Sequence, residues 1–225
     1  MAGFDTPEPK GGVRTSSRSD PGHADDPISI RLARPHELGD IAALYAPALE
    51  PYRGSGSDWI LDAYLAELIN VRPRFVEAEV LVAEHDGRIA GTITFYADVR
   101  HEGWSNLPAG WAGFRALAVP PRMRGAGIGK VLVQHCVERT RDVGAETLGI
   151  HTISLLTDAV RLYQRLGFAR CPEFDLRAAD VFPSEHADEM VGLAFRRDVE
   201  PAPRSPPRRP GPHHHDHREG AGTVL

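Results

Sequence analysis

Three glycines alternate with other residues in the stretch RGAGIGK, residues 124–130, which lies between a strand-like and a helix-like segment. Glycine has no Cβ atom and readily adopts positive φ, so such a loop lets a bulky ligand approach its backbone N–H groups. The beginning of the following helix adds unpaired N–H donors and a partial positive charge. The stretch therefore predicts a phosphate-binding loop.

The glycine spacing excludes the two best-known phosphate loops. A P-loop needs a glycine five positions before its Gly-Lys pair and a hydroxyl residue after it, but Arg124 and Val131 occupy these positions. A dinucleotide-binding loop needs G-x-G-x-x-G, and Lys130 stands where its last glycine should be. The pattern that fits is R/Q-x-x-G-x-G/A, which runs from Arg124 to Gly129.

Hydrophobic patterning around the loop predicts one domain, residues 27–199, built from strands and helices. The strands are expected at 28–33, twice within 79–99 with a hairpin turn at Asp86-Gly87, and at 111–119, 146–153 and 189–199. The helices are expected at 35–49, 58–69, 125–141 and 158–166. This order predicts a mixed, mostly antiparallel central sheet flanked by helices, an α/β (α+β) fold, rather than a doubly wound parallel one.

The two ends of the chain differ from this domain in composition. Residues 1–26 and 200–225 are rich in Gly, Pro and polar residues, so we expect a disordered arm and a disordered tail. The tail contains a histidine tract, His213–His215 with His217, which could bind a metal but which we expect to be solvated.

Composition also limits the location and the partners. The formal net charge of −5 argues against a nucleic-acid partner. The chain shows neither an apolar signal sequence nor about 18 consecutive apolar residues, so we expect a cytoplasmic protein without a membrane partner. Its two cysteines, Cys136 and Cys171, do not form a CxxC motif, and we expect both to be reduced and Cys136 to be a core residue.

The loop and the residues after it resemble the GNAT acetyltransferase superfamily. The resemblance covers about 55 residues, from FRALAV through the glycine loop to LYQRLGF, residues 114–168. It implies a GNAT-like fold in which acetyl-CoA lies between two splayed central strands. It also implies an N-acetyltransferase without a metal, in which an amine acceptor attacks the thioester directly. The residues that the resemblance implies for cofactor binding are Leu117, Ala118, Val119, Arg124, Gly125, Ala126, Gly127, Ile128, Gly129 and Lys130.

The resemblance also suggests which residue handles the departing proton and leaves one role unassigned. Tyr163 matches the family's frequent general-acid tyrosine and is expected to protonate the CoA thiolate, the alternative being that it packs a short helix against the sheet. Many relatives carry an asparagine where this chain has Leu156, and a strand glutamate where it has Gly113 and Arg115. A general base is therefore not assigned. Its candidates are Glu84, His101 and Glu102, although we expect each of them to be a solvated charge. A water chain, or an amine that arrives neutral, would also serve.

These departures leave a second hypothesis open, a non-catalytic acyl-CoA-binding or sensing module. The identity of the acceptor, a small molecule or a peptide amine, stays open as well. We expect its site to be bordered by residues 48–76 and 172–189. His151 lies near the expected mouth of the cleft and is expected to be a hydrogen-bonded strand residue. A homodimer is possible, and nothing in the sequence decides it.

Overall fold

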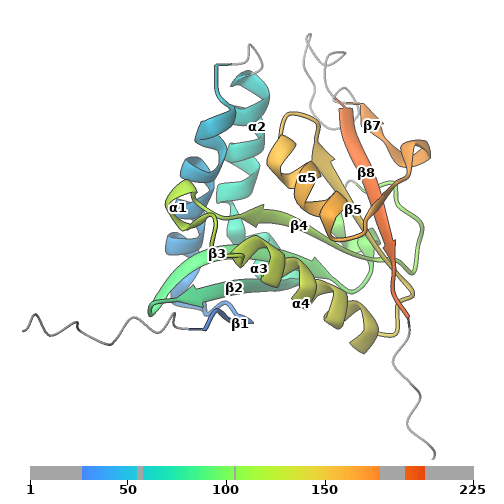
Figure 1. Cartoon of the computed structure of the whole chain (residues 1–225), viewed down its shortest axis with the longest axis horizontal. Helices are drawn as coiled ribbons and strands as arrows, with labels where there is room; N and C mark the ends of the chain where they lie inside the picture. The colour runs from blue at the N-terminus through green and yellow to red at the C-terminus, as the bar shows by residue number, and fades with distance from the viewer. Residues whose placement is uncertain (1–26, 55–57, 104, 178–190, 201–225) are drawn as a thin grey trace, which may run out of the picture.

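The computed structural model describes residues 27–54, 58–103, 105–177 and 191–200 (Figure 1). The predicted arm 1–26 lies outside the described residues, and so does the predicted tail with its histidine tract, apart from Glu200. The mixed strand and helix content that the sequence predicts is present in the described part.

Strands and helices follow one another in nearly the predicted order. The strands are β1 (Ser29–Leu32), β2 (Glu79–His85), β3 (Arg88–Tyr96), β4 (Ala112–Ala118), β5 (Thr147–Ile153), β6 (Ala169–Arg170), β7 (Leu176–Arg177) and β8 (Val191–Asp198). The α-helices are α1 (Leu38–Leu49), α2 (Asp58–Ile69), α3 (Val71–Glu77), α4 (Ile128–Asp142) and α5 (Thr157–Arg165). Short 3₁₀ helices are η1 (Pro35–Glu37), η2 (Glu50–Tyr52), η3 (Val99–Glu102), η4 (Pro121–Met123) and η5 (Pro172–Phe174). Across the ranges described, no helix combines the length and the apolar character that a membrane span needs.

The strands form one mixed sheet in the order β1-β2-β3-β4-β5-β8-β6, with β7 also paired to β8. Every described strand pair is antiparallel except β4 with β5, which is parallel. The predicted fold class, a mostly antiparallel sheet flanked by helices, is therefore confirmed.

Alternation along the strands supplies two separate cores, one on each face of the sheet. In β2, Leu81 and Ala83 pack in the core beneath α4 and α5, whereas Val80 and Val82 pack in the core beneath α1, α2 and α3. Figure 1 shows α4 and α5 on the near face of the sheet and α1 at the other side of the strands. The sheet thus separates two hydrophobic cores, each covered by a different set of helices.

The single parallel pair opens along its length. β4 and β5 are in register only at Ala112 with Leu148 and at Gly113 with Gly149. Beyond this point each strand continues for several residues without pairing to the other. The backbone groups on the facing edges of the two strands are then available to a ligand. This confirms the expected splay of the central strands.

Three differences from the predicted elements have local causes. The helix expected from residue 125 begins at Ile128, because Gly125 and Gly127 have φ values of +91° and +82°, which lie outside the helical region. Helix α3 was not predicted, since Pro73 interrupts an otherwise short pattern and packing against β2 stabilises it. Strands β6 and β7, of two residues each, are too short to leave a periodic signal.

Candidate functional site

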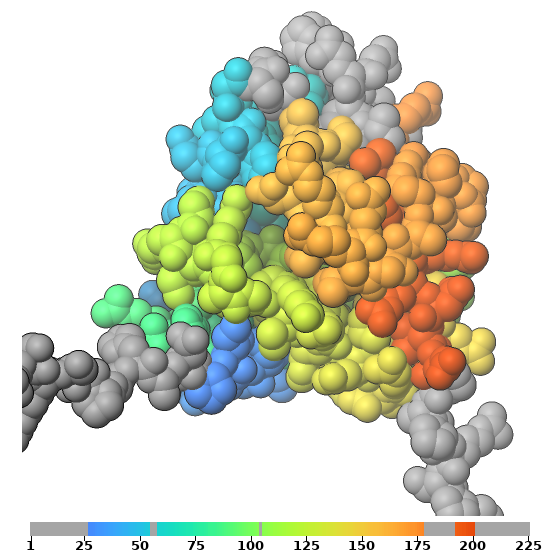
Figure 2. Space-filling model, in the orientation of Figure 1, coloured from blue at the N-terminus to red at the C-terminus, as the bar shows by residue number. Residues whose placement is uncertain are grey.

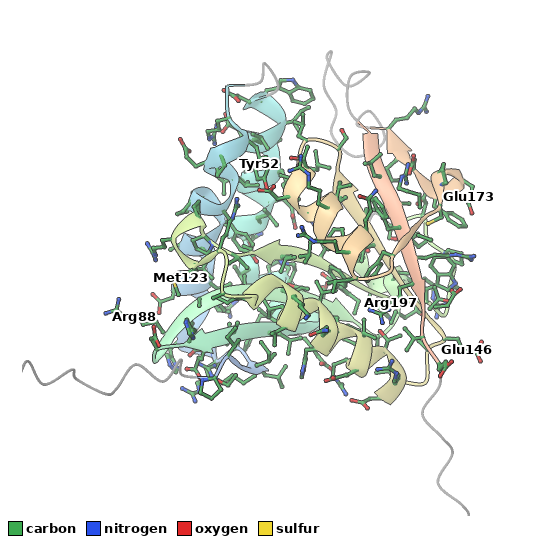
Figure 3. The ribbon with its side chains drawn as sticks, viewed as in Figure 1. Tyr52, Arg88, Met123, Glu146, Glu173 and Arg197 are labelled. Carbon is green, nitrogen blue, oxygen red and sulfur yellow. The ribbon has the colours of Figure 1, made fainter. Side chains whose placement is uncertain are left out.

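A pocket of about 530 Å³ opens where the splayed strands, the glycine loop and three helices meet. Its walls come from α1, η2 and α2 on one side, from the end of β4 and the loop before α4 at the base, and from α5 on the other side. Figure 2 shows these segments next to one another on one face of the molecule, in blue to cyan, yellow-green and orange. Tyr52, labelled in Figure 3, lies between the α1–α2 pair and α5.

The glycine loop leads into the pocket and leaves its amides open. Gly127 is the N-cap of α4 and no side chain caps this helix. The first ladder bond runs from the Val131 N–H group to the Gly127 carbonyl, 3.0 Å. The N–H groups of Ile128, Gly129 and Lys130 therefore have no acceptor within the helix. Together with the helix dipole they have the geometry and the partial positive charge that suit an anion.

The three glycines of the loop serve two different purposes. Gly125 and Gly127 have positive φ, and a Cβ atom added to either would contact nothing within 4 Å, so conformation is what requires glycine there. Gly129 lies inside α4 with helical φ, and its added Cβ would come within 3.3 Å of the Leu162 side chain and 3.9 Å of Val119. This third glycine lets α4 pack closely against α5. The sequence pattern alone does not separate this packing role from the conformational role of the other two glycines.

A β-bulge shapes the strand that forms the base of the pocket. Thr92 pairs with Ala118 and Thr94 with Arg115, so two residues of β4, Ala116 and Leu117, lie opposite one residue of β3, Ile93. Ala116 takes the extra position with a φ of +55°, unusual for a residue with a side chain. The bulge breaks the ladder next to Leu117 and Ala118, which line the pocket. It therefore turns backbone groups of β4 toward the site.

Arg124 lines the pocket, but its guanidinium group is engaged by protein groups. Nη1 contacts the Asp158 carboxylate at 3.2 Å, Nη2 the Ala48 carbonyl at 2.9 Å and Nε the Val119 carbonyl at 3.1 Å. The ring of Tyr52 lies 5.8 Å from the guanidinium carbon, and its hydroxyl group donates to Asp158 at 3.1 Å. Arg124 thus joins α1, the loop and α5 across the mouth of the pocket.

Two further cations stand at the rim of the pocket. Lys130 at the beginning of α4 and Arg165 at the end of α5 are exposed and both line it. Sequence reasoning named Lys130 but missed Arg165, because a basic residue in the last turn of a helix is common without any ligand. The structure shows no hydrogen bond or ion pair of either side chain to the described residues. Both can therefore approach a multiply charged phosphate ligand without breaking such a contact.

Tyr163 is buried beneath the pocket rather than lining it. Its ring packs against Phe114, Phe168 and Phe195, with centroids 5.6, 5.8 and 6.3 Å away. Burial raises the pKa of its hydroxyl group well above the usual range, with smaller contributions from neighbours that include Tyr64 and Tyr52. Both of these neighbours line the pocket. The phenol therefore stays protonated at neutral pH, and its acid role stays a prediction.

A polar cluster lies on the face of β4 that is turned away from Tyr163. It is formed by Glu67, Arg74, Glu102 and Arg115. Glu67 of α2 accepts hydrogen bonds from Arg115 Nη2 at 2.5 Å and from Arg74 Nη1 at 3.0 Å. Glu102 of η3 lies 3.8 Å from Arg115 Nε. Arg74, Arg115 and Glu102 are each more than nine-tenths buried. The cluster adjoins the pocket through Tyr64, which lines it and interacts electrostatically with Arg115 and Glu67.

The structure corrects the expectation that Glu102 is a solvated loop charge. Only 1% of its side chain is exposed. Burial raises its pKa from the ordinary 4.5 to about 7, against the opposing effects of Arg115 and Ser105. Glu84, by contrast, is bound by Arg31, which lowers its pKa, so it behaves as a paired charge.

The cysteines and the strand histidine behave as core residues. Cys136 and Cys171 are buried, and burial raises the pKa of both thiols, so neither forms a thiolate readily. His151 Nε2 lies 3.0 Å from the Phe174 carbonyl oxygen, and burial lowers the pKa of its imidazole. The hydrogen-bonded strand histidine expected from the sequence is confirmed.

Of the ten residues predicted to bind the cofactor, nine line the pocket and Ala126 does not. Leu156, which stands where many relatives have asparagine, lines the pocket as the N-cap of α5. Tyr52 and Tyr64 lie within the range 48–76 that was expected to border the acceptor site. Sequence reasoning did not single out any of the three pocket tyrosines, Tyr45, Tyr52 and Tyr64, since tyrosines at helical spacing usually indicate core packing.

A family model agrees with this geometry. Residues 40–168, more than half of the chain, match the acetyltransferase (GNAT) family. The chain belongs to this family. The matched region runs from α1 through the glycine loop to Phe168 and contains most of the pocket walls.

Two curated relatives show how far the similarity extends. A streptothricin acetyltransferase from Streptomyces lavendulae is 33% identical over 86 residues, 38% of this chain and 41% of the relative. A mycothiol acetyltransferase from Sanguibacter keddieii is 30% identical over 155 residues, 64% of this chain and 44% of the relative. The chain thus spans less than half the length of these two acetyltransferases.

Solved structures share the fold at low sequence identity. The PaiA N-acetyltransferase from Thermoplasma acidophilum, solved in complex with coenzyme A, has a TM-score of 0.58 at 15% identity and covers 77% of this chain and 100% of its own. A putative acetyltransferase from Salmonella typhimurium, solved with its cofactor acetyl-CoA, has a TM-score of 0.52 at 18% identity, with 81% and 99% covered. At these identities the likeness establishes the GNAT fold.

Proposed function

We propose that this GNAT protein transfers the acetyl group of acetyl-CoA directly to an amine acceptor within a ternary complex. The observation that carries the proposal is the pocket itself, which joins an open helix N-terminus to the unpaired edge of a bulged central strand. A diphosphate fits the first feature, and an extended amide-containing arm fits the second. Family membership and the two neighbours solved with coenzyme A or acetyl-CoA support this cofactor.

The residues of the loop divide the work of holding the cofactor. The N–H groups of Ile128, Gly129 and Lys130 face the diphosphate, and the side chains of Lys130 and Arg165 add positive charge at the rim. Arg124 acts chiefly by keeping the pocket walls together, since Asp158 and two carbonyl groups already occupy its guanidinium group. The cofactor-binding role of the predicted residues rests on this placement.

The chemistry proceeds at the bulge of β4. The neutral amine attacks the thioester carbon, and the resulting oxyanion accepts a hydrogen bond from a backbone N–H group of the strand near Leu117. Tyr163 protonates or hydrogen-bonds the departing thiolate from the α5 side. Alignment of both reactants in one pocket supplies about 7 to 11 kcal/mol of the acceleration. The acceptor stays unidentified beyond its amine group.

The cofactor part of the proposal is tested with Gly127→Asp. Aspartate caps helices well, so α4 should form, but its charge would face the diphosphate and the positive φ would add strain. We expect the affinity for coenzyme A, measured by calorimetry, to fall at least about 100-fold, equivalent to about 2.7 kcal/mol. Gly144→Asp is the matched control: Gly144 also has positive φ and open space but follows the other end of α4. Equal affinities for the two variants would refute the assignment.

The activity is tested by incubating the protein with acetyl-CoA and a panel of amines while following the release of free thiol. Acetylated products are then identified by mass spectrometry. Tyr163→Phe should lower kcat more than it weakens coenzyme A binding if the phenol donates a proton. Tight binding of acetyl-CoA without thiol release for every amine would support the sensing module instead.

A further inference from the structure

Glu102 is a buried carboxylate without the hydrogen bonds that normally accompany one. No hydrogen bond of normal geometry reaches either of its oxygens among the described residues; its nearest charge, Arg115 Nε, is 3.8 Å away, and the neighbouring Ser105 side chain is the one uncharged group that favours its ionised form. Buried polar groups in native proteins are nearly always satisfied, so an exception of this kind calls for a reason. Thr94 Oγ1, opposite Arg115 in the sheet, also lacks a partner within the described chain. Two polar side chains on one face of the sheet, Glu102 and Thr94, thus have hydrogen-bonding capacity that the described residues do not use.

The fold holds Glu102 firmly in this place. Asp98 caps η3 by accepting a hydrogen bond from the Arg100 N–H group at 2.9 Å, and Gly103 ends η3 with a φ of +91°. Val99 lies directly on β4, because a Cβ atom on Gly113 would come within 2.6 Å of Val99 Cγ1. Glycine at position 113 therefore lets η3 lie against the strand. That contact brings a glutamate from a neighbouring segment to the face of β4 on which the strand itself carries Arg115.

The position of Glu102 relative to the reaction centre follows from β4. Phe114 packs against Tyr163 on one face of this strand, whereas Arg115 points to Glu67 and Glu102 on the other. The bulge at Ala116 comes next. A thioester held at the bulge would therefore have a tyrosine on the α5 side and a carboxylate on the α2 side. Tyr64, which lines the pocket, forms the boundary between the pocket and this carboxylate cluster.

We propose that Glu102 is the proton acceptor for the amine substrate, on the face of β4 opposite Tyr163. The inference rests on the proposed acetyl transfer and names the group that prepares its nucleophile. Glu102 accepts a proton from the ammonium form R–NH₃⁺, which leaves neutral R–NH₂ and a protonated carboxyl group. The amine nitrogen then forms the C–N bond to the acetyl carbon, and the C–S bond breaks. The Tyr163 phenol gives its proton to the thiolate, the second proton of the nitrogen passes through water to restore the phenol, and Glu102 returns its own proton to water.

The charges around Glu102 suit this task. It interacts with Arg115 from β4, Glu67 from α2, Tyr96 from β3 and Ser105 from the segment after η3. Tyr64 from α2 and Arg74 from α3 interact in turn with these groups. The two arginines are balanced in part by Glu67, so Glu102 is not locked into an ion pair with short hydrogen bonds. Its pKa of about 7 lets it exist in both protonation states near neutral pH, which is the condition for efficient base catalysis.

Other carboxylates near the site are already engaged. Asp158 accepts from Arg124, Arg161 and Tyr52. Glu67 accepts from two arginines. Both carboxylates thus already have several hydrogen-bond donors bound to them, so neither matches the role as Glu102 does. The substrate class follows: an amine that reaches the site protonated, rather than an alcohol or a thiol.

The test compares Glu102→Gln with Glu102→Asp and with Glu79→Gln. Glu79 lies on β2 in an ion pair with Arg139, away from the pocket, and serves as the control. With the amine of the panel that releases thiol fastest, Glu102→Gln should lower kcat/KM for the amine about 100-fold at pH 7. The rise of the rate with an apparent pKa of about 7 should disappear. The loss should shrink toward pH 9, where more of the amine arrives neutral, and Glu102→Asp should keep the rising limb.

A second measurement does not depend on any acceptor. The protein is labelled with ¹³C at the glutamate carboxyl carbons, and the signal absent from Glu102→Gln is followed by NMR during a pH titration. A midpoint of about 7 supports the proposal, whereas titration near the ordinary value of 4.5 overturns it. Normal coenzyme A binding with an unchanged pH–rate profile in Glu102→Gln also overturns it, as does acetyl-CoA binding without acetylation of any amine between pH 6 and 9. Loss of coenzyme A binding in the unmodified protein would instead overturn the proposed function.

Discussion

Two buried glutamates in this GNAT protein, Glu37 and Glu102, are 6% and 5% exposed, yet they have opposite properties. Glu37 accepts hydrogen bonds from Arg31 at 2.6 and 2.9 Å and from the Arg34 N–H group at 2.7 Å. These bonds, chiefly those from Arg31, hold its pKa at about 2. Glu102 has one arginine at 3.8 Å and a pKa raised to about 7 by burial.

The difference teaches how burial acts on a carboxylate. Burial alone disfavours the charged form, and hydrogen bonds to the charged form more than reverse the effect. Glu37 therefore behaves as a structural group that fastens the beginning of α1 to β1 through Arg31. Glu102 lacks such bonds, which makes it a costly group to maintain and points to a chemical role. The predictions below test this contrast.

The largest effect on stability is expected from Arg31→Met. Arg31 binds both Glu37 and Glu84, and its removal would leave Glu37 charged and buried without a partner. We expect the free energy of unfolding at pH 7, measured in urea, to fall by about 3 to 5 kcal/mol. A loss below about 1 kcal/mol would mean that Glu37 is not held by this pair and that the contrast fails.

The pH dependence of stability should have opposite signs for the two glutamates. The pKa of Glu37 is lower in the folded state, so its contribution is present above pH 4.5 and is lost as the pH falls through about 2. Glu37→Gln should therefore cost up to about 3 kcal/mol at pH 7. The pKa of Glu102 is higher in the folded state, so stability falls as the pH rises from 4.5 through about 7. Glu102→Gln should gain up to about 3 kcal/mol at pH 8 and little at pH 4.5.

Chemical unfolding of both variants at several pH values measures these shifts. Thermal unfolding gives a second estimate, provided that the transition is reversible. Equal slopes for Glu102→Gln and the unmodified protein between pH 5 and 8 would contradict a raised pKa. A gain in stability together with a loss of activity in the same variant would be the pattern expected of a strained functional group.

The smallest effect is expected from Glu79→Gln, which removes the carboxylate of a partly exposed ion pair. Glu79 and Arg139 join β2 to α4 with bonds of 2.5 and 2.9 Å, but about a third of each side chain is exposed. Solvent screening should limit the loss in unfolding free energy to about 1 kcal/mol or less at any pH between 5 and 8. A loss as large as that of Glu37→Gln would show that exposure does not separate the two kinds of pair.

Local signals were enough to predict most of the elements. Helix α2 has the bounds that its apolar pattern predicts, and the Asp86-Gly87 dipeptide marks the turn between β2 and β3. Both signals act over a few residues, through side-chain periodicity and turn conformation. The beginning of α4 was placed three residues too early, because glycine is compatible with a helix and with the positive φ that Gly127 actually adopts.

The sequence predicted individual residues on one side of the candidate site only, and for the α1–α2 side it gave no more than the range 48–76. Residues of the loop and of β4 that line the pocket lie close together in the sequence, from Leu117 to Lys130. The opposite side depends on α1 and α2, whose tyrosines reach the pocket from more than 50 residues away. Periodicity assigns such tyrosines to a core because it does not show where a core has an opening.

The sequence by itself determined the glycine loop, the order of strands and helices, and the membership in a family that these features indicate, because they depend on backbone conformation and short-range spacing. Only the tertiary structure decided the ionisation of its glutamates. The residues His101 and Glu102 were predicted to be solvated charges. In the structure Glu102 is buried, because η3 lies against Gly113 and beside Arg115. A pKa depends on solvation and on charges that the fold brings together from distant segments. The residues next to a glutamate in the sequence predict neither of these.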